Sequence, residues 1–312
     1  MEIKNVVIAG AGTMGYSMAQ IFAKYGYAVT VYDVNRRALD NAQECIRKNV
    51  ETLIKQGELD VNLANTLIER LAYTDEKDCF ASCDIVIESI IEKLEIKKSF
   101  YAEISRIVRE DAILATNTSG LSINAIAEAV HIPERFIGMH WFNPSHLILL
   151  IELIKGDRTN TKTAETVREL SLAIRKKPVV VEKDVPGFVA NRIQFAVLRE
   201  ALDLVEKGVI SKEGMDDVMK YGLGFRYACV GPLEVADFGG LDTFYHISSY
   251  LMKDLCREEG VPALLRECFE KGEYGVKSKK GFYDYSQDRD VLATEKRDEK
   301  LLKLFNAFYK EN

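Results

Sequence analysis

The stretch Val6-Val7-Ile8-Ala9-Gly10-Ala11-Gly12-Thr13-Met14-Gly15 joins an apolar strand to a glycine-rich turn and an apolar helix. The order strand, G-x-G-x-x-G and helix is typical of a dinucleotide-binding loop. Gly10 permits the tight turn, Gly12 lets the backbone approach a pyrophosphate, and Gly15 lets the helix pack closely on the strand. The helix N-terminus then faces the phosphates. We therefore expect the loop to contact the cofactor through Gly10, Gly12, Thr13, Met14 and Gly15.

Asp33 indicates which dinucleotide is bound. It follows the second apolar strand, where a carboxylate can accept hydrogen bonds from both ribose hydroxyls of NAD. Its negative charge would repel the 2′-phosphate of NADP. Arg36 and Arg37 lie close by in sequence and leave NADP as the alternative. The sequence thus favours NAD as the cofactor.

The composition is that of an ordinary globular protein. It has 312 residues, 47% of them hydrophobic and 29% charged, which predicts two domains with little disorder. A net charge of −6 gives no electrostatic footprint for nucleic acid. Because the N-terminus leads directly into a strand and no apolar run approaches 20 residues, we expect a cytoplasmic protein without a membrane partner. The six cysteines form no CxxC pair and predict neither a metal site nor disulfides.

Two kinds of periodicity divide the chain. Short β-branched runs alternate with helical patterns up to about residue 182, which predicts a mostly parallel sheet of Rossmann type. Asp184-Val185-Pro186-Gly187 interrupts this pattern, so we place an NAD-binding domain at 1–184 and an all-helical domain at 185–312. The predicted strands are 5–9, 28–32, 84–88, 112–116, 135–139, 149–154 and 178–182. The predicted helices include a hairpin of 35–56 with 59–71, and then 188–207, 212–221, 241–259 and 261–271.

His140 is the candidate general base. It ends one predicted strand, where open α/β sheets place their ligands, and removal of a hydride from a carbinol carbon requires a group that takes the hydroxyl proton. If 135–140 and 149–154 are neighbouring antiparallel strands, His140 lies opposite Glu152. That carboxylate would fix the histidine tautomer and stabilise the imidazolium. A lone histidine at a strand end is otherwise usually structural, and His131 and His146 are assigned no catalytic role.

Ser119 and Asn191 are candidates for hydrogen bonds to the substrate oxygen as charge develops on it. Each of them also has a purely structural interpretation. Ser119 follows Asn117-Thr118 and could be a helix N-cap, and Asn191 could cap or pack the first turn of the helix 188–207.

Taken together, the motifs make the chain resemble the L-3-hydroxyacyl-CoA dehydrogenase family over nearly its whole length. The resemblance rests on 10–15, Asn117-Thr118-Ser119, Gly138-Met139-His140-Trp141-Phe142-Asn143-Pro144, 184–192, Gly231-Pro232-Leu233-Glu234 and Gly281-Phe282-Tyr283. It implies a Rossmann-type domain, a helical C-terminal domain that forms a homodimer, and reversible NAD-dependent oxidation of an L-3-hydroxyacyl thioester to the 3-ketoacyl form.

The resemblance also assigns residue roles. The family's histidine and glutamate fall on His140 and Glu152, and its substrate-contacting serine and asparagine fall on Ser119 and Asn191. Positions near the nicotinamide and its ribose correspond to Glu92, Lys97, Asn117 and Asn143.

Departures from the family pattern bear on the substrate. After Asn143-Pro144 the family pattern resembles V-P-V-M-K, but here Leu149 stands where its lysine is expected. The hairpin tip, usually rich in lysine, reads Lys55-Gln56-Gly57-Glu58. Lysines attract CoA phosphates, so their loss weakens the thioester assignment without excluding it. A CoA-free hydroxy acid, a carnitine-like alcohol or a ring-borne alcohol is the alternative substrate, and a non-catalytic NAD(H)-binding protein is the alternative class.

Overall fold

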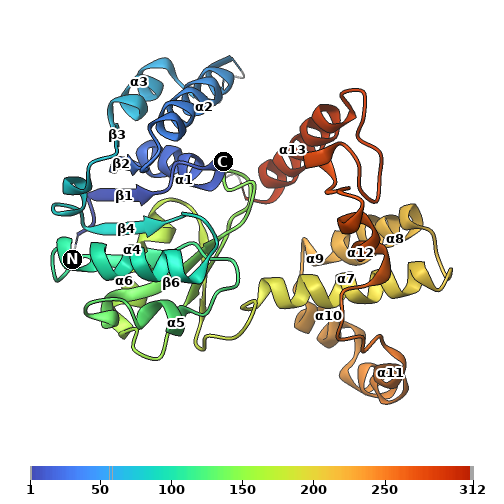
Figure 1. The fold of residues 1–312 in the computed structure, drawn as a ribbon. Coiled ribbons are helices and arrows are strands. Elements are labelled where there is room, and N and C mark those ends of the chain that lie inside the picture. Colours follow the sequence, from blue (N-terminus) through green and yellow to red (C-terminus); the bar gives the residue numbers. More distant parts are fainter. Residues whose placement is uncertain (1, 56, 58, 310–312) are drawn as a thin grey trace. The chain divides into compact units, whose positions relative to one another are not determined.

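The computed structural model describes residues 2–55, 57 and 59–309, which divide into two compact units, Met1–Arg192 and Ile193–Asn312. The sheet of the first unit has the order β3-β2-β1-β4-β5-β6-β7-β8 (Figure 1). Its only antiparallel pair among the described strands is β6 with β7. The strands are β1 Asn5–Ala9, β2 Ala28–Tyr32, β3 Leu71–Thr74, β4 Ile85–Glu88, β5 Ile113–Thr116, β6 Phe136–Trp141, β7 Leu150–Ile154 and β8 Lys177–Val181.

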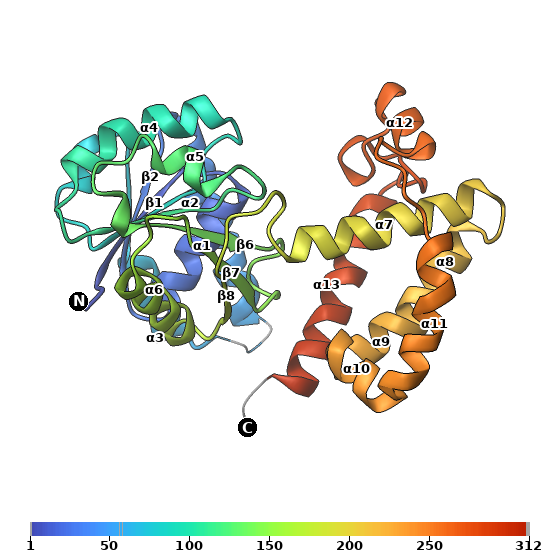
Figure 2. The same ribbon diagram turned by 90° about the horizontal axis from the view of Figure 1, so that it is seen from below.

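Helices cover both faces of this sheet, as a mostly parallel sheet requires. One face carries α1 Thr13–Lys24, α2 Arg36–Lys55, α3 Val61–Glu69 and α6 Thr161–Ala173, and the other carries α4 Leu94–Ile107 and α5 Ile123–Ala127 (Figure 2). Two buried apolar clusters fill the layers. The first includes Phe22 and Met139, and the second includes Tyr101 and Phe136. The predicted Rossmann-type sheet is confirmed.

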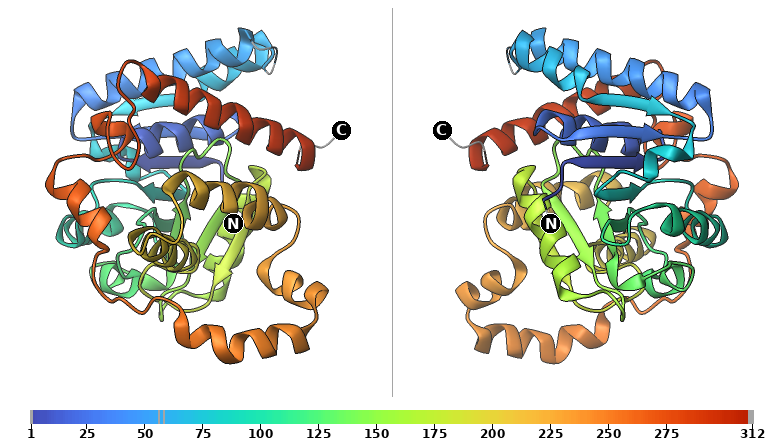
Figure 3. Two further views of the ribbon diagram at one scale, coloured as in Figure 1. Left: turned by 90° about the vertical axis from the view of Figure 1, so that its right-hand side faces the viewer. Right: turned by 90° about the vertical axis from the view of Figure 1, so that its left-hand side faces the viewer.

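The predicted helical hairpin is present as α2 and α3, which lie side by side (Figure 3). Asp60 caps the start of α3, because its side chain accepts hydrogen bonds from the backbone N–H groups of Asn62 and Leu63. Of the predicted hairpin tip, Gln56 and Glu58 lie outside the described residues.

The second unit is helical, as the sequence predicted. Its first helix, α7 Ala190–Glu206, begins at the end of the first unit. The others are α8 Lys212–Val218, α9 Gly224–Tyr227, α10 Pro232–Gly239, α11 Leu241–Asp254, α12 Ala263–Glu270 and α13 Arg289–Phe308. A π-helical turn, Met219–Leu223, joins α8 to α9. None of the helices in the described part of the chain has the length and hydrophobicity that crossing a bilayer requires.

The sequence did not predict β3, α9, α10 or α13. The strand β3 was not predicted, because it is a four-residue edge strand whose side chains are mostly half-buried and give no apolar run. The helix α10 was missed, and so was α13, whose sequence is dominated by charged residues. The predicted domain boundary after residue 184 stays a prediction.

Candidate active site

The glycine turn has the geometry that a pyrophosphate site needs. Gly10 has a φ of +108°, and a Cβ there would lie 2.5 Å from the carbonyl oxygen of Ser89. A Cβ on Gly15 would lie 1.8 Å from the carbonyl oxygen of Gly10, so helix and strand pack too closely for any side chain. A Cβ on Gly12 would meet no atom within 4 Å. The turn is therefore rigid at two glycines and open at the third, immediately before α1, which fits a bound dinucleotide.

Asp33 fastens this turn to the end of β2. One carboxylate oxygen accepts the backbone N–H of Ala11 at 2.8 Å, and the other accepts the backbone N–H of Asn35 at 2.9 Å. Arg36 is one of the two arginines that kept NADP as the alternative cofactor. It pairs with Asp75 at 3.6 Å and with Asp40 at 4.0 Å. The guanidinium therefore has two carboxylates beside it, and their negative charges disfavour a 2′-phosphate there.

His140 and Glu152 meet as the sequence predicted. They are paired residues in the antiparallel register of β6 and β7, and Nδ1 of His140 lies 2.9 Å from Oε2 of Glu152. Both side chains are buried, with exposed fractions of 4% and 2%. The rings of Phe142 and Phe188 pack against the imidazole, at centroid distances of 4.4 and 5.6 Å. The pair is therefore held in one geometry in an apolar setting.

The other oxygen of Glu152 binds the start of α7. It accepts the backbone N–H groups of Val189 at 3.0 Å and Ala190 at 2.8 Å. Burial raises the pKa of Glu152, but the hydrogen bonds from His140 and from the two N–H groups outweigh it and hold this pKa below its ordinary value. The carboxylate is consequently ionised at neutral pH.

The structure also brings Ser119 and Asn191 together. The side-chain amide of Asn191 donates a hydrogen bond to the backbone carbonyl of Ser119 at 2.7 Å. The side-chain oxygen of Asn117 accepts the N–H of Trp141 at 2.8 Å, which ties the turn after β5 to the end of β6. Asn143 is exposed just beyond β6. All these residues lie in the first unit.

Lys97 and Glu88 are buried and form an ion-pair network with Glu92, whose side chain is exposed. Nζ of Lys97 lies 2.5 Å from Glu88 and 3.3 Å from Glu92, and its side chain is 1% exposed. Glu92 also accepts hydrogen bonds from the hydroxyl of Thr118 and the N–H of Ser119. Glu88 was missed by the sequence reasoning, although a carboxylate at the end of the otherwise apolar strand Ile85–Glu88 was a signal. The predicted contact of Lys97 with the cofactor ribose stays a prediction.

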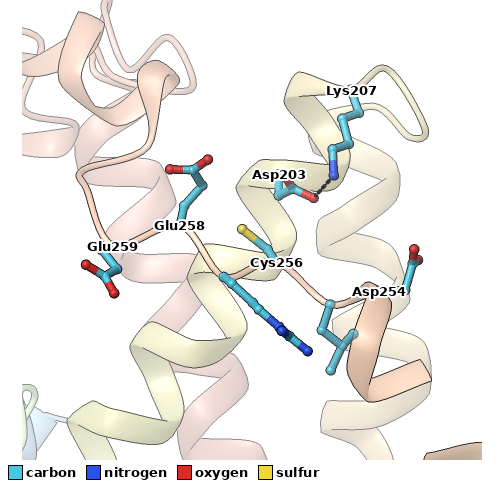
Figure 4. Close-up of a pocket in the computed structure, with 8 residues that line it drawn as sticks. Asp203, Lys207, Asp254, Cys256, Glu258 and Glu259 are labelled. Carbon is cyan, nitrogen blue, oxygen red and sulfur yellow. Dashed lines mark hydrogen bonds and ion pairs between the residues drawn. The ribbon is translucent and has the colours of Figure 1, made fainter. Parts of the chain in front are cut away.

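A separate cavity of about 560 Å³ lies in the second unit (Figure 4). Charged side chains dominate its lining, and Lys207 pairs with Asp203 at 2.7 Å. Cys256 also lines it. None of the residues predicted to carry the reaction lies there, so we assign this cavity no part in the chemistry.

A sheet of this order with such a glycine turn is typical of dinucleotide-binding domains. Two family models narrow the class. The model of the 3-hydroxyacyl-CoA dehydrogenase NAD-binding domain matches residues 5–185, and the model of the C-terminal domain of that enzyme matches residues 187–285. The chain therefore belongs to the 3-hydroxyacyl-CoA dehydrogenase family. The predicted family, enzyme class and NAD cofactor are confirmed.

Relatives carry two different names. The chain is 38% identical over 301 residues to 5-formyl-3-hydroxy-2-methylpyridine 4-carboxylate 5-dehydrogenase of Mesorhizobium japonicum, covering 96% of both proteins. It is 39% identical over 279 residues to a probable 3-hydroxybutyryl-CoA dehydrogenase of Deinococcus radiodurans, covering 89% of this chain and 99% of the relative.

Solved structures similar to this chain also include both kinds of enzyme. A crystal structure of the pyridine carboxylic acid dehydrogenase, called an NAD+-dependent dismutase, superposes with a TM-score of 0.91 at 35% identity and covers 100% of both chains. The (S)-3-hydroxybutyryl-CoA dehydrogenase of Ralstonia eutropha superposes with a TM-score of 0.77 at 36% identity, covering 92% of this chain and 100% of the other.

Proposed function

We propose that this protein oxidises an alcohol with NAD, using His140 as the general base. The observation that carries the proposal is the 2.9 Å contact between Nδ1 of His140 and Glu152. Because Nδ1 is engaged, Nε2 is the ring nitrogen that takes the proton from the substrate hydroxyl. NAD, when bound, would supply the acceptor for the hydride from the carbinol carbon. The carbinol becomes a carbonyl, and the imidazole holds the proton.

The ionised Glu152 stabilises the imidazolium that forms in this step. Ser119 and Asn191 hold the substrate oxygen in our proposal, and their mutual hydrogen bond at 2.7 Å supports it because it fixes both residues in one place. The amide of Asn191 has a second N–H beyond the one that it gives to Ser119.

We propose that the cofactor is held by the residues that follow β1, β2, β4, β5 and β6. The loop with Gly10, Gly12, Thr13, Met14 and Gly15 takes the pyrophosphate, and Asp33 takes the adenine-side ribose. Glu92, Lys97, Asn117 and Asn143 serve the nicotinamide end. We retain residues 1–184 as the NAD-binding domain and 185–312 as the helical domain.

The substrate that we propose first is an L-3-hydroxyacyl-CoA, which is converted reversibly to the 3-ketoacyl-CoA. Support comes from the family models over residues 5–285 and from relatives named 3-hydroxybutyryl-CoA dehydrogenase. A CoA-free substrate, such as a ring-borne alcohol with a carboxylate, is the second candidate. The full-length TM-score of 0.91 to the pyridine carboxylic acid dehydrogenase favours it, as does Leu149 in place of a lysine.

A substrate panel separates the two candidates. The purified protein is mixed with NADH and acetoacetyl-CoA, or with NAD and 3-hydroxybutyrate, carnitine or a hydroxymethyl- or formyl-pyridine carboxylate, and absorbance at the NADH band is followed. Turnover of acetoacetyl-CoA supports the thioester. Turnover of a CoA-free compound alone overturns the thioester and establishes the second candidate.

Replacement of His140 tests the chemistry itself. His140→Ala is expected to lower kcat by about 10²–10⁴-fold, the usual share of a general base, while the Kd for NAD stays near that of the wild type. His131→Ala is the matched control, since His131 is exposed and has no proposed role. Unchanged turnover in His140→Ala would remove the proposed base.

We also propose a homodimer formed through the second unit. Among the described residues of Ile193–Asn312, the buried hydrophobic ones are only Leu202, Val235 and Cys256, while Phe225, Phe238 and Tyr245 are more than 70% exposed. So much uncovered apolar surface favours a partner, and a second copy is the partner that the family resemblance implies. Light scattering after size exclusion should give twice the chain mass.

The cytoplasm is our proposed location. All six cysteines are free, which suits a reducing compartment.

A further inference from the structure

Lys176 is a buried ammonium in the turn between α6 and β8. Its residue is 4% exposed, and burial alone lowers its pKa to about 8. Among the described residues, no carboxylate forms an ion pair with it. Burying a charge in this way costs free energy unless hydrogen bonds compensate.

The compensation comes from one turn of the chain. Nζ of Lys176 donates hydrogen bonds to the carbonyl oxygens of Ser145 and Ile148, the second at 2.8 Å. The turn closes on itself because the N–H of Ile148 donates to the carbonyl of Pro144 at 3.0 Å. Nζ also lies 5.3 Å from the centre of the Trp141 ring, within cation–π range.

This turn connects the two strands that hold the histidine–glutamate pair. It begins directly after Asn143, two residues beyond the end of β6, and leads into β7. The hydroxyls of Ser145 and Ser17 share a hydrogen bond, and Ser17 lies in α1, the helix that follows the glycine turn. Lys176 therefore anchors a segment that is joined to both the catalytic strands and the cofactor helix.

Packing alone does not explain a lysine at this position. An apolar side chain of similar length would fill the space against Trp141 without desolvating a charge, and such replacements of buried charges are often neutral or stabilising for folding. An apolar side chain would, however, supply no hydrogen-bond donor for the carbonyl groups of Ser145 and Ile148. The free-energy cost of burying the ammonium is thus offset by the two hydrogen bonds that hold the turn in one conformation.

We propose that Lys176 is a positioning residue for the dehydrogenase reaction. It holds the turn Pro144–Ile148 so that Asn143 stays beside the cofactor and His140 stays opposite Glu152. The inference rests on the proposed function, which gives Asn143 and His140 their roles.

The kinetic test uses Lys176→Met with Lys177→Met as the matched control, because Lys177 is the next residue and is exposed. Lys176→Met is expected to lower kcat by about 10- to 100-fold, as misplaced groups do, with the Kd for NAD nearly unchanged. Lys176→Arg, which keeps the charge and the donors, should recover part of the loss. Wild-type kcat in Lys176→Met overturns the inference. If that variant does not fold, Lys176→Leu, which also lacks a donor, is measured, and wild-type kcat in it overturns the inference.

A spectroscopic test needs no substrate, because Trp141 is the only tryptophan. An ammonium over its ring should make the emission titrate with a midpoint near pH 8, in the wild type and in Lys177→Met. His146 lies in the turn and Arg175 precedes Lys176, so His146→Gln is included as a second control that removes the imidazole of the turn and keeps Lys176.

Loss of this titration in Lys176→Met, and its persistence in His146→Gln, support the proposal that Lys176 holds this turn. A titration that persists in Lys176→Met overturns it. If the wild type oxidises no substrate of either class, the proposed function fails, and the emission still decides whether Lys176 lies against the turn.

Discussion

Glu152 contacts Ala190 as well as His140, and it uses a different carboxylate oxygen for each. The oxygen that faces Ala190 accepts the backbone N–H at the first residue of α7, at 2.8 Å. The same side chain thereby orients the imidazole and satisfies a helix start that would otherwise leave donors without partners. Its removal should therefore affect both chemistry and folding, and the two effects can be separated.

Glu152→Gln keeps the shape of the side chain but loses its charge. We expect kcat to fall by about 10²-fold or more, because the imidazolium is no longer stabilised, and NAD affinity to change little. Stopped-flow NADH formation and equilibrium NAD titration measure the two. Weaker NAD binding with a wild-type kcat at saturating NAD would instead give Glu152 a folding role.

The same variant should change how stability depends on pH. The folded-state pKa of Glu152 lies below its ordinary value, so its contribution to stability is present above pH 4.5 and disappears as pH falls through the lowered pKa. A hydrogen bond to an ionised carboxylate is worth about 2 kcal/mol. Urea unfolding at neutral and acidic pH should show a smaller acid-side loss for Glu152→Gln than for the wild type. Equal losses would contradict the assignment.

Two glycines of one turn should respond oppositely to alanine. Gly12→Ala meets no atom within 4 Å, so the protein should fold normally while NAD affinity drops by about tenfold or more, because the Cβ occupies the approach of the pyrophosphate. Gly15→Ala places a Cβ 1.8 Å from a backbone oxygen and should destabilise the fold itself. Thermal melting and NAD titration test both. A normal melting temperature for Gly15→Ala would show that α1 can shift.

Asp33 should determine the choice of cofactor. Asp33→Asn removes the charge that repels a 2′-phosphate, and we expect the preference for NAD over NADP in kcat/KM to fall by about tenfold. Asp111→Asn is the control, because it removes an exposed carboxylate paired with Arg109 at 3.1 Å and far from Asp33 in the chain. An unchanged preference in Asp33→Asn would show that another residue discriminates between NAD and NADP.

Much of the fold followed from local pattern. The strands β1 and β2 were placed at their observed bounds, because strands buried on both faces give uninterrupted apolar runs between turn residues. β3 could not be found in this way, since an edge strand paired only with β2 has no such run. In the second unit, helical periodicity located α11 but not α13, in which charges mask the apolar stripe.

The sequence by itself determined the glycine turn, the acidic residue after β2 and the candidate pair His140 and Glu152, because each depends on residue type and short spacing. Tertiary structure decided what pairs with what. It placed Lys97 between two carboxylates. It also brought Lys176 within hydrogen-bond distance of a turn that is about 30 positions away along the chain. Such contacts arise from the packing of helices on a sheet, which brings together residues that no local pattern relates.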